Sequence, residues 1–213
     1  MNKNRLEAFS DGVFAIAITL LILNVKIPQA NYVSGQQLYK VLHQAIPKLL
    51  TFAFTFLVIG VFWIAHHRIF AFAKVTDSIL MWINIVYLMF IALIPYPAAL
   101  LAENPYLPIT IIIYSSTLFV IAVMHLILLE YIIRNNHTRH EILTDEVYRS
   151  AQKTALVGPV CYVLAAAGSY IHFYISFFFI LSAMVYYIFF AGHAKMSQEL
   201  VKIGETTKEE EGK

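Results

Sequence analysis

Six apolar segments of helix length alternate with short polar stretches along this sequence. Of its 213 residues, 60% are hydrophobic and 13% are charged, whereas soluble domains carry about 25% charged residues. A membrane-spanning helix needs about 20 mainly apolar residues, because its backbone groups must be satisfied without water. We therefore expect an all-α bundle of six transmembrane helices. The predicted spans are residues 6–27, 45–65, 78–101, 107–131, 154–168 and 172–193.

Prolines are expected to interrupt two of these spans. Proline lacks a backbone N–H and its ring clashes with the preceding helical turn. Pro95 and Pro97 should therefore bend or end the third span, and Pro159 should kink the fifth. We treat residues 1–196 as one six-helix membrane domain and residues 197–213 as a charged cytoplasmic tail.

Lysine and arginine are distributed unevenly between the two sides of the predicted membrane. An even number of spans puts both termini on one side, together with the loops at 66–77 and 132–153. That side carries twelve of the 15 basic residues, and the other side carries Lys26, Lys40 and Lys48. Because cytoplasmic loops are rich in Lys and Arg, both termini are predicted to be cytoplasmic. The long external loop, 28–44, contains a stretch at 36–43 that could form a short interfacial helix.

The first span carries one narrow stripe of mainly apolar residues. At about 100° per residue, the stripe lies within about 60° of Ile16, and Asp11 lies about 140° away from it. If the stripe faces a central axis, Asp11 points into its own bundle and needs a partner there, since an unpaired buried carboxylate is costly. The same spacing suits ordinary helix packing, so periodicity does not distinguish a pore from a subunit interface. The stripe consists of Gly12, Ile16, Thr19, Leu20, Leu23 and Ile27.

Two motifs at the first two spans allow a comparison with a known family. They are Arg5-x-x-x-Phe9-Ser10-Asp11-Gly-Val-Phe-Ala-Ile and Phe62-Trp63-Ile-Ala-His66-His67-Arg68. Both resemble the transmembrane protein 175 family of potassium-permeable channels. The resemblance implies a single-repeat channel of the prokaryotic plasma membrane, which assembles as a homotetramer around a central pore lined by the first helix.

The resemblance also implies a role for each of two residue sets. The expected ion pathway is lined by Ile16, Thr19, Leu20 and Leu23, and the expected structural or gating network is Arg5, Phe9, Ser10, Asp11, Trp63 and His67. In such a pore the apolar rings form a constriction that a partly dehydrated cation can cross. The expected partners are other copies of the chain, the lipid bilayer and monovalent cations. Apart from permeant K⁺, no cofactor or metal is expected.

Two other membrane functions remain open from the residues alone. A proton-coupled secondary transporter could use Asp11 and Glu130 with a helix broken at Pro159. However, Glu130 lies near a helix end, where Arg134 can pair with it at i+4. A non-conducting membrane scaffold would use the stripe only for subunit packing.

The remaining classes have weaker support in the sequence. Haem ligation by two membrane histidines is less favoured than histidines at helix ends and a His125 bonded inside the bundle. No nucleophile, base and orienting group occur together, so an enzyme is not expected. A net charge of +2 gives no sign of nucleic-acid binding, and the single Cys161 is read as a core residue.

Overall fold

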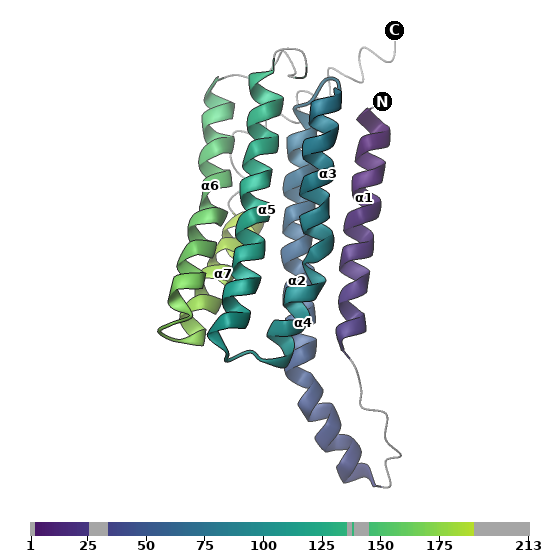
Figure 1. Ribbon diagram of the computed structural model, residues 1–213, viewed down its shortest axis with the longest axis vertical. Coiled ribbons are helices and arrows are strands. Elements are labelled where there is room, and N and C mark those ends of the chain that lie inside the picture. The colour runs from purple at the N-terminus through teal and green to yellow at the C-terminus, as the bar shows by residue number, and fades with distance from the viewer. Residues whose placement is uncertain (1–2, 26–33, 136–137, 139–144, 190–213) are drawn as a thin grey trace.

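The regular elements in the part of the chain that the structure describes are all helices. A computed structural model describes residues 3–25, 34–135, 138 and 145–189, and Figure 1 shows how its helices are arranged. The first helix, α1, continues into a short 3-10 helix, η1. The elements are α1 (Lys3–Leu20), η1 (Leu21–Asn24), α2 (Gly35–Ala71), α3 (Ser78–Leu93), α4 (Pro95–Glu103), α5 (Pro108–Arg134), α6 (Asp145–Gly168) and α7 (Phe173–Phe189).

Several of these helices have the length and composition of membrane spans. Within the described residues, four stretches are long and apolar enough to cross a bilayer. A further apolar helix, α7, is shorter, with 17 residues. The chain is therefore an all-α membrane protein. The four stretches are Lys3–Asn24, Gly35–Ala71, Ser78–Glu103 and Pro108–Arg134.

The second helix is longer than the sequence predicted. It is one continuous helix of 37 residues, about 55 Å long at 1.5 Å per residue, against about 30 Å for a bilayer core. Ser34 caps it by accepting a hydrogen bond from the Gln37 backbone N–H. The prediction of a separate short helix at 36–43 is wrong, because the helix passes through Pro47. Because proline has no backbone N–H, the carbonyl four residues before it loses its helical partner. The residues around Pro47 are mostly exposed, so this carbonyl is not buried.

The prolines of the third and fifth spans have different effects. Helix α3 ends at Leu93 and α4 begins at Pro95, which confirms the predicted interruption. Helix α6 continues through Pro159 and begins at Asp145, well before the predicted start at 154. The end of the sixth predicted span, at 190–193, and the predicted tail at 197–213 lie outside the described residues, as does part of the external loop at 28–33.

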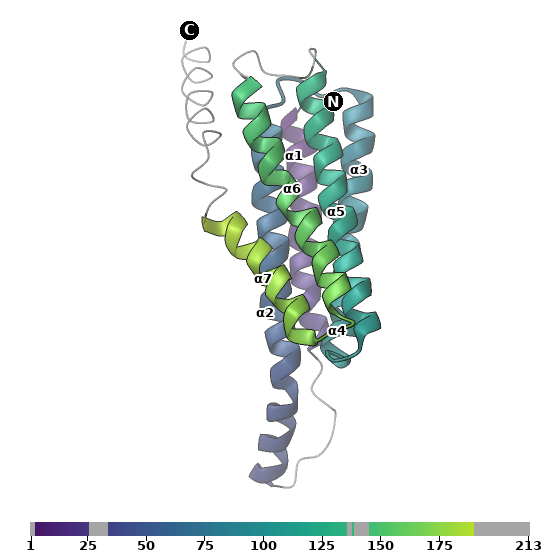
Figure 2. The ribbon, with the colours of Figure 1, turned by 90° about the vertical axis from the view of Figure 1, so that its left-hand side faces the viewer.

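The helices form a bundle with α1 at one edge. Helix α1 packs against α2 and α3, whereas α5 contacts α3, α4 and α6, and α6 contacts α7. Figures 1 and 2 show α1 beside α2 and α3, with α4 and the α6–α7 turn at the end of the bundle opposite the start of α1. We call that opposite end the far end. The core holds fully buried Phe14, Tyr87 and Tyr114, and half-buried Cys161 packs against it.

Candidate functional site on the first helix

Helix α1 has one face buried against its own bundle. Residues on this face recur every three or four positions, which keeps them on one side of a helix. The face includes one polar residue, Ser10, which is fully buried. The buried residues of α1 and η1 are Leu6, Ser10, Phe14, Ala17 and Leu21.

The opposite face of α1 carries the predicted stripe. Ile16 is 60% exposed, Leu20 is 42% exposed and Leu23 is 63% exposed, and Thr19 is also exposed. Because these side chains point away from their own bundle, they must meet lipid, another protein chain or an ion route. This is the orientation that a pore-lining stripe requires.

Thr19 is the polar residue of the exposed stripe. Its hydroxyl Oγ1 donates within its own helix, to the carbonyls of Ala15 at 2.9 Å and Ile16 at 3.0 Å. Threonine in a helix often bonds backward in this way. With its proton so engaged, the hydroxyl presents its oxygen lone pairs outward, where they can accept from water or coordinate a cation.

A buried hydrogen-bonded chain joins α1 to α2 and α3. The Ser10 hydroxyl donates to the Leu6 carbonyl at 2.8 Å and accepts from Asn84 Nδ2 at 3.0 Å. Asn84 Oδ1 lies 2.8 Å from His66 Nε2, so His66 donates through Nε2. All three side chains are at most 2% exposed. The bonds satisfy groups that would be costly to bury unpaired.

A second polar contact lies on the exposed side of the α1–α2 boundary. Trp63 Nε1 donates to Asp11 Oδ1 at 2.8 Å, and the His67 ring stacks on Trp63 with 6.3 Å between centroids. Asp11 thus has a partner in its own chain, as expected. It does not point into the bundle interior, however, because both Asp11 and Trp63 are exposed. The rotation of α1 places Ser10, the residue before Asp11, toward the core instead.

The predicted network is therefore divided into two. Ser10 belongs to the buried chain, and Asp11, Trp63 and His67 form the exposed contact. Arg5 does not join either: it is exposed, and within the described part of the chain the nearby charged contact is Lys3 Nζ to Glu7 Oε1 at 4.0 Å. Phe9 is 53% exposed and contributes no polar group.

Asn84 and His66 were not identified from the sequence. Asn84 is a polar residue inside an otherwise apolar helix, and such residues usually mark a packing network or a pathway. That signal was available for Asn84. His66 and His67 are adjacent, about 100° apart on a helix, and the motif does not indicate which one turns inward.

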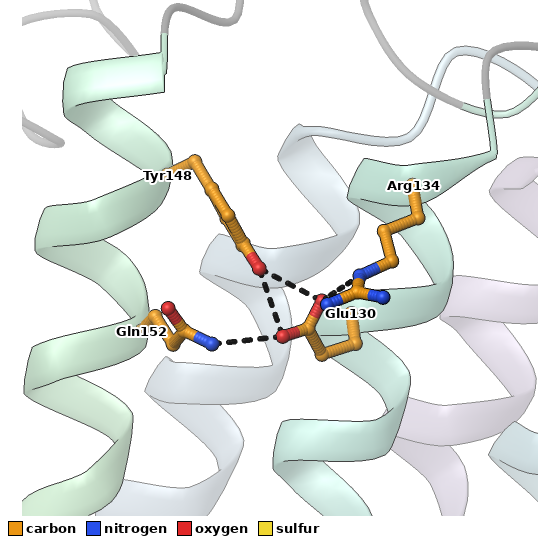
Figure 3. A network of polar contacts seen from close by, with 4 residues as sticks. All are labelled: Glu130, Arg134, Tyr148 and Gln152. Atoms are coloured by element: carbon orange, nitrogen blue, oxygen red, sulfur yellow. Dashed lines mark hydrogen bonds and ion pairs between the residues drawn. The ribbon is translucent and has the colours of Figure 1, made fainter.

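Glu130 lies in a separate polar network between α5 and α6 (Figure 3). Arg134 Nε donates to Glu130 Oε2 at 2.8 Å, which confirms the predicted i+4 pair. Gln152 Nε2 donates to Oε1 at 2.8 Å, and the Tyr148 hydroxyl lies 2.8 and 2.9 Å from the two oxygens. Because the donors come from α5 and α6, these contacts link the two helices through Glu130.

The two histidines inside the bundle, His66 and His125, both lie near Tyr87. The Tyr87 ring stacks on His66 at 5.5 Å and lies 6.2 Å from His125. His66 also uses its Nε2 for Asn84. Within the described residues, no group of three or more His, Cys, Asp or Glu side chains could hold a metal ion.

Together, the fold and the exposed apolar stripe define an all-α membrane protein with an unpartnered face on its first helix. Comparison with known proteins identifies the class as ion channels. A family profile described as "Endosomal/lysosomal potassium channel TMEM175" matches residues 5–95. A protein named as a potassium channel from Chamaesiphon minutus is 35% identical over 181 residues, covering 81% of this chain and 86% of that protein. The chain belongs to the TMEM175 family.

Two further comparisons agree. The crystal structure of a lysosomal potassium-selective channel TMEM175 homolog from Chamaesiphon minutus matches with a TM-score of 0.76 and 33% identity, covering 87% of this chain and 96% of that chain. A protein named as a potassium channel from Streptomyces collinus is 47% identical over 104 residues. That alignment spans 48% of this chain and 50% of the length of the relative. The relatives are thus ion channels rather than enzymes.

Proposed function

We propose that this chain forms a potassium-selective cation channel, with α1 lining a central pore in a homotetramer. The observation that carries the proposal is the exposed row of Ile16, Leu20 and Leu23, which are 60%, 42% and 63% exposed in the single chain. One such helix cannot enclose a pore, whereas several copies around a symmetry axis can. The potassium-channel names of the relatives support K⁺ as the permeant ion.

In the assembled channel, the apolar residues of α1 form successive rings around the ion route. A narrow apolar ring excludes water and blocks ions, and a slightly wider ring passes a partly dehydrated cation. Because K⁺ releases its hydration water more readily than Na⁺, such a constriction favours K⁺. The outward oxygen of Thr19 replaces part of the lost hydration. Asp11 and Trp63 hold the orientation of α1 from outside the route.

The topology proposed for this function has six spans. The two spans added to the four long apolar stretches are α6 and α7, and residues 1–196 form the channel domain. The excess of Lys and Arg at the end where α1 begins supports cytoplasmic termini. We place the protein in a prokaryotic plasma membrane, with the tail at 197–213 in the cytoplasm.

The decisive experiment is ion flux through purified protein in liposomes with mixed K⁺ and Na⁺ gradients. Wild-type protein should carry K⁺ in preference to Na⁺, and Ile16→Asn should reduce that preference by opening the constriction to hydrated ions. Met89→Asn is the matched control, because Met89 on α3 is 58% exposed but lies off the stripe. Equal reversal potentials for wild-type and Ile16→Asn would refute the assignment of the pore.

Recordings in planar bilayers separate this function from its rivals. A channel gives unitary current steps, whereas a proton-coupled transporter gives slow flux without steps. A scaffold gives neither. Unitary K⁺ currents that disappear or change amplitude in Leu23→Ala would support the proposal.

A further inference from the structure

A large apolar cavity lies between α2 and α7, away from the stripe on α1. Its volume is about 570 Å³, which is within the range of about 300–1,000 Å³ typical of ligand pockets. Pro105 and Tyr106 of the α4–α5 turn line it at the far end of the bundle. Its walls include Phe54, Leu57, Ile111, Phe173, Phe177 and Ile180.

The cavity is about one leaflet deep. On α2 its lining runs from Pro47 to Leu57, a rise of about 15 Å at 1.5 Å per residue, against a hydrocarbon core of about 30 Å. On α7 the lining begins at Phe173, the first residue of the helix at the far end. An apolar cavity of this depth, with its lining beginning at the far end of the bundle, suits a single acyl chain.

Charged groups next to the far-end lining of the cavity match a zwitterionic headgroup. Lys48 Nζ lies 3.9 Å from Glu103 Oε1, and their side chains are 28% and 63% exposed. Both residues adjoin lining segments, because Lys48 follows Pro47 and Glu103 precedes Pro105. The lysine ammonium can face a lipid phosphate, and the glutamate can face the lipid amine. Tyr106, 76% exposed, adds an aromatic side chain of the kind that lies at headgroup level.

Ser176 is a buried polar residue in the lining of the cavity. It lines the wall and is 1% exposed, and its hydroxyl has no hydrogen-bond partner within the described residues. A buried hydroxyl without a partner is unfavourable. Ser176 lies three residues into α7, about 4.5 Å below Phe173, which is the level of the ester groups beneath a headgroup. An ester carbonyl there would accept its hydrogen bond.

We propose that this cavity binds one acyl chain of a phospholipid with a phosphate and a primary amine in its headgroup, such as phosphatidylethanolamine. Its walls hold the chain, Ser176 bonds the ester carbonyl, and the Lys48–Glu103 pair binds the headgroup. The lipid then fills the space between α2 and α7 and fixes their spacing.

The test uses full-length protein extracted from vesicles of equal parts phosphatidylethanolamine and phosphatidylglycerol, with bound lipid counted by native mass spectrometry. Wild-type protein should retain one phosphatidylethanolamine per chain. Ala53→Phe, which fills the cavity from α2, should reduce retention about tenfold, the scale expected when a buried contact set is lost. Val160→Phe is the control, because Val160 is 57% exposed on α6 and does not line the cavity; it should behave as wild type.

The headgroup assignment has its own measurement. Lys48→Gln combined with Glu103→Gln should abolish the preference for phosphatidylethanolamine over phosphatidylglycerol while leaving chain binding intact. Equal lipid retention by wild type and Ala53→Phe would overturn the proposal, and so would a density map in which a neighbouring subunit fills the cavity. Neither measurement depends on ion flux, so its failure is distinguishable from failure of the proposed channel function.

Discussion

Trp63 donates its indole N–H to the carboxylate of Asp11, and this 2.8 Å bond joins α2 to α1 on the side where neither residue is buried. Asp11 lies about 140° around α1 from Ile16, so the bond lies off the exposed stripe. It therefore fixes which way α1 is turned without placing a charge in the proposed ion route. We therefore expect its loss to affect how the helices hold together and not which ion passes.

Breaking the Asp11–Trp63 bond should weaken the assembly or its opening and leave ion preference unchanged. Asp11→Ala and Trp63→Phe should each lower the thermal stability of the oligomer, with a coupling of about 1 kcal/mol in a double-mutant cycle. Trp82→Phe is the control, since Trp82 is 67% exposed on α3. Additive single effects would contradict the coupling. A changed reversal potential in Asp11→Ala would mean that the carboxylate faces the ions.

Asn84 should be the most sensitive polar residue of the buried core. Replacing it by Leu removes the donor to Ser10 and the acceptor for His66. The His66 Nε2 then loses this buried partner, and the Ser10 hydroxyl keeps only its bond to the Leu6 carbonyl. We expect a loss of about 2–4 kcal/mol in the free energy of unfolding, measured by denaturant unfolding in detergent. Ser182→Ala is the control, because that hydroxyl donates to the Phe178 carbonyl of its own helix. If both variants lost the same small amount, the buried chain would have no structural role.

Thr19→Val should lower K⁺ conductance and the preference for K⁺ over Na⁺. Valine keeps the shape of threonine but lacks the oxygen that faces outward from the stripe. Thr117→Val on α5 is a close match, because its hydroxyl also bonds a backbone carbonyl one turn earlier, that of Ile113 at 2.9 Å. Single-channel currents in planar bilayers measure the effect. Identical currents in Thr19→Val and wild type would show that the oxygen takes no part in conduction.

Helical periodicity placed Ile16, Thr19, Leu20 and Leu23 on one face of α1. The accompanying prediction that Asp11 points into the bundle is wrong, because Asp11 is exposed. The sequence also predicted the Glu130–Arg134 pair, since i and i+4 residues meet on any helix. Contacts between different helices were harder to predict from the sequence. Tyr148 and Gln152 were not linked to Glu130 because α6 was expected to begin at 154, and its polar first turns do not resemble a membrane span.

The buried hydrogen bonds of Asn84 are a second example of contacts between helices that the sequence did not predict. Asn84 could be recognised as unusual from its apolar neighbours, but its partners depend on where α3 meets α1 and α2. No spacing along one helix contains that information. The choice between His66 and His67 depended on the rotation of α2, which the packing of Phe14 and Tyr87 against His66 determines.

Gly158 is a position where the packing of α6 against α7 tolerates little change. A Cβ atom there would lie 2.9 Å from the Tyr187 hydroxyl and 3.4 Å from the Tyr162 ring. The Gly158 backbone N–H also donates to that hydroxyl at 2.9 Å. Pro159 follows directly and limits how far the backbone can shift. Gly158→Ala should therefore push Tyr187 away, break its bond and destabilise the protein by about 1–3 kcal/mol.

Gly60→Ala separates this packing effect from the intrinsic preference of helices for alanine. At Gly60 an added methyl meets no atom within 4 Å in the chain, so alanine should be neutral or stabilising by up to about 1 kcal/mol. Thermal unfolding of the two variants in the same detergent compares them directly. Tyr187→Phe combined with Gly158→Ala should recover part of the loss, because the clashing oxygen is removed. No recovery would mean that the strain lies in the helix backbone rather than against Tyr187.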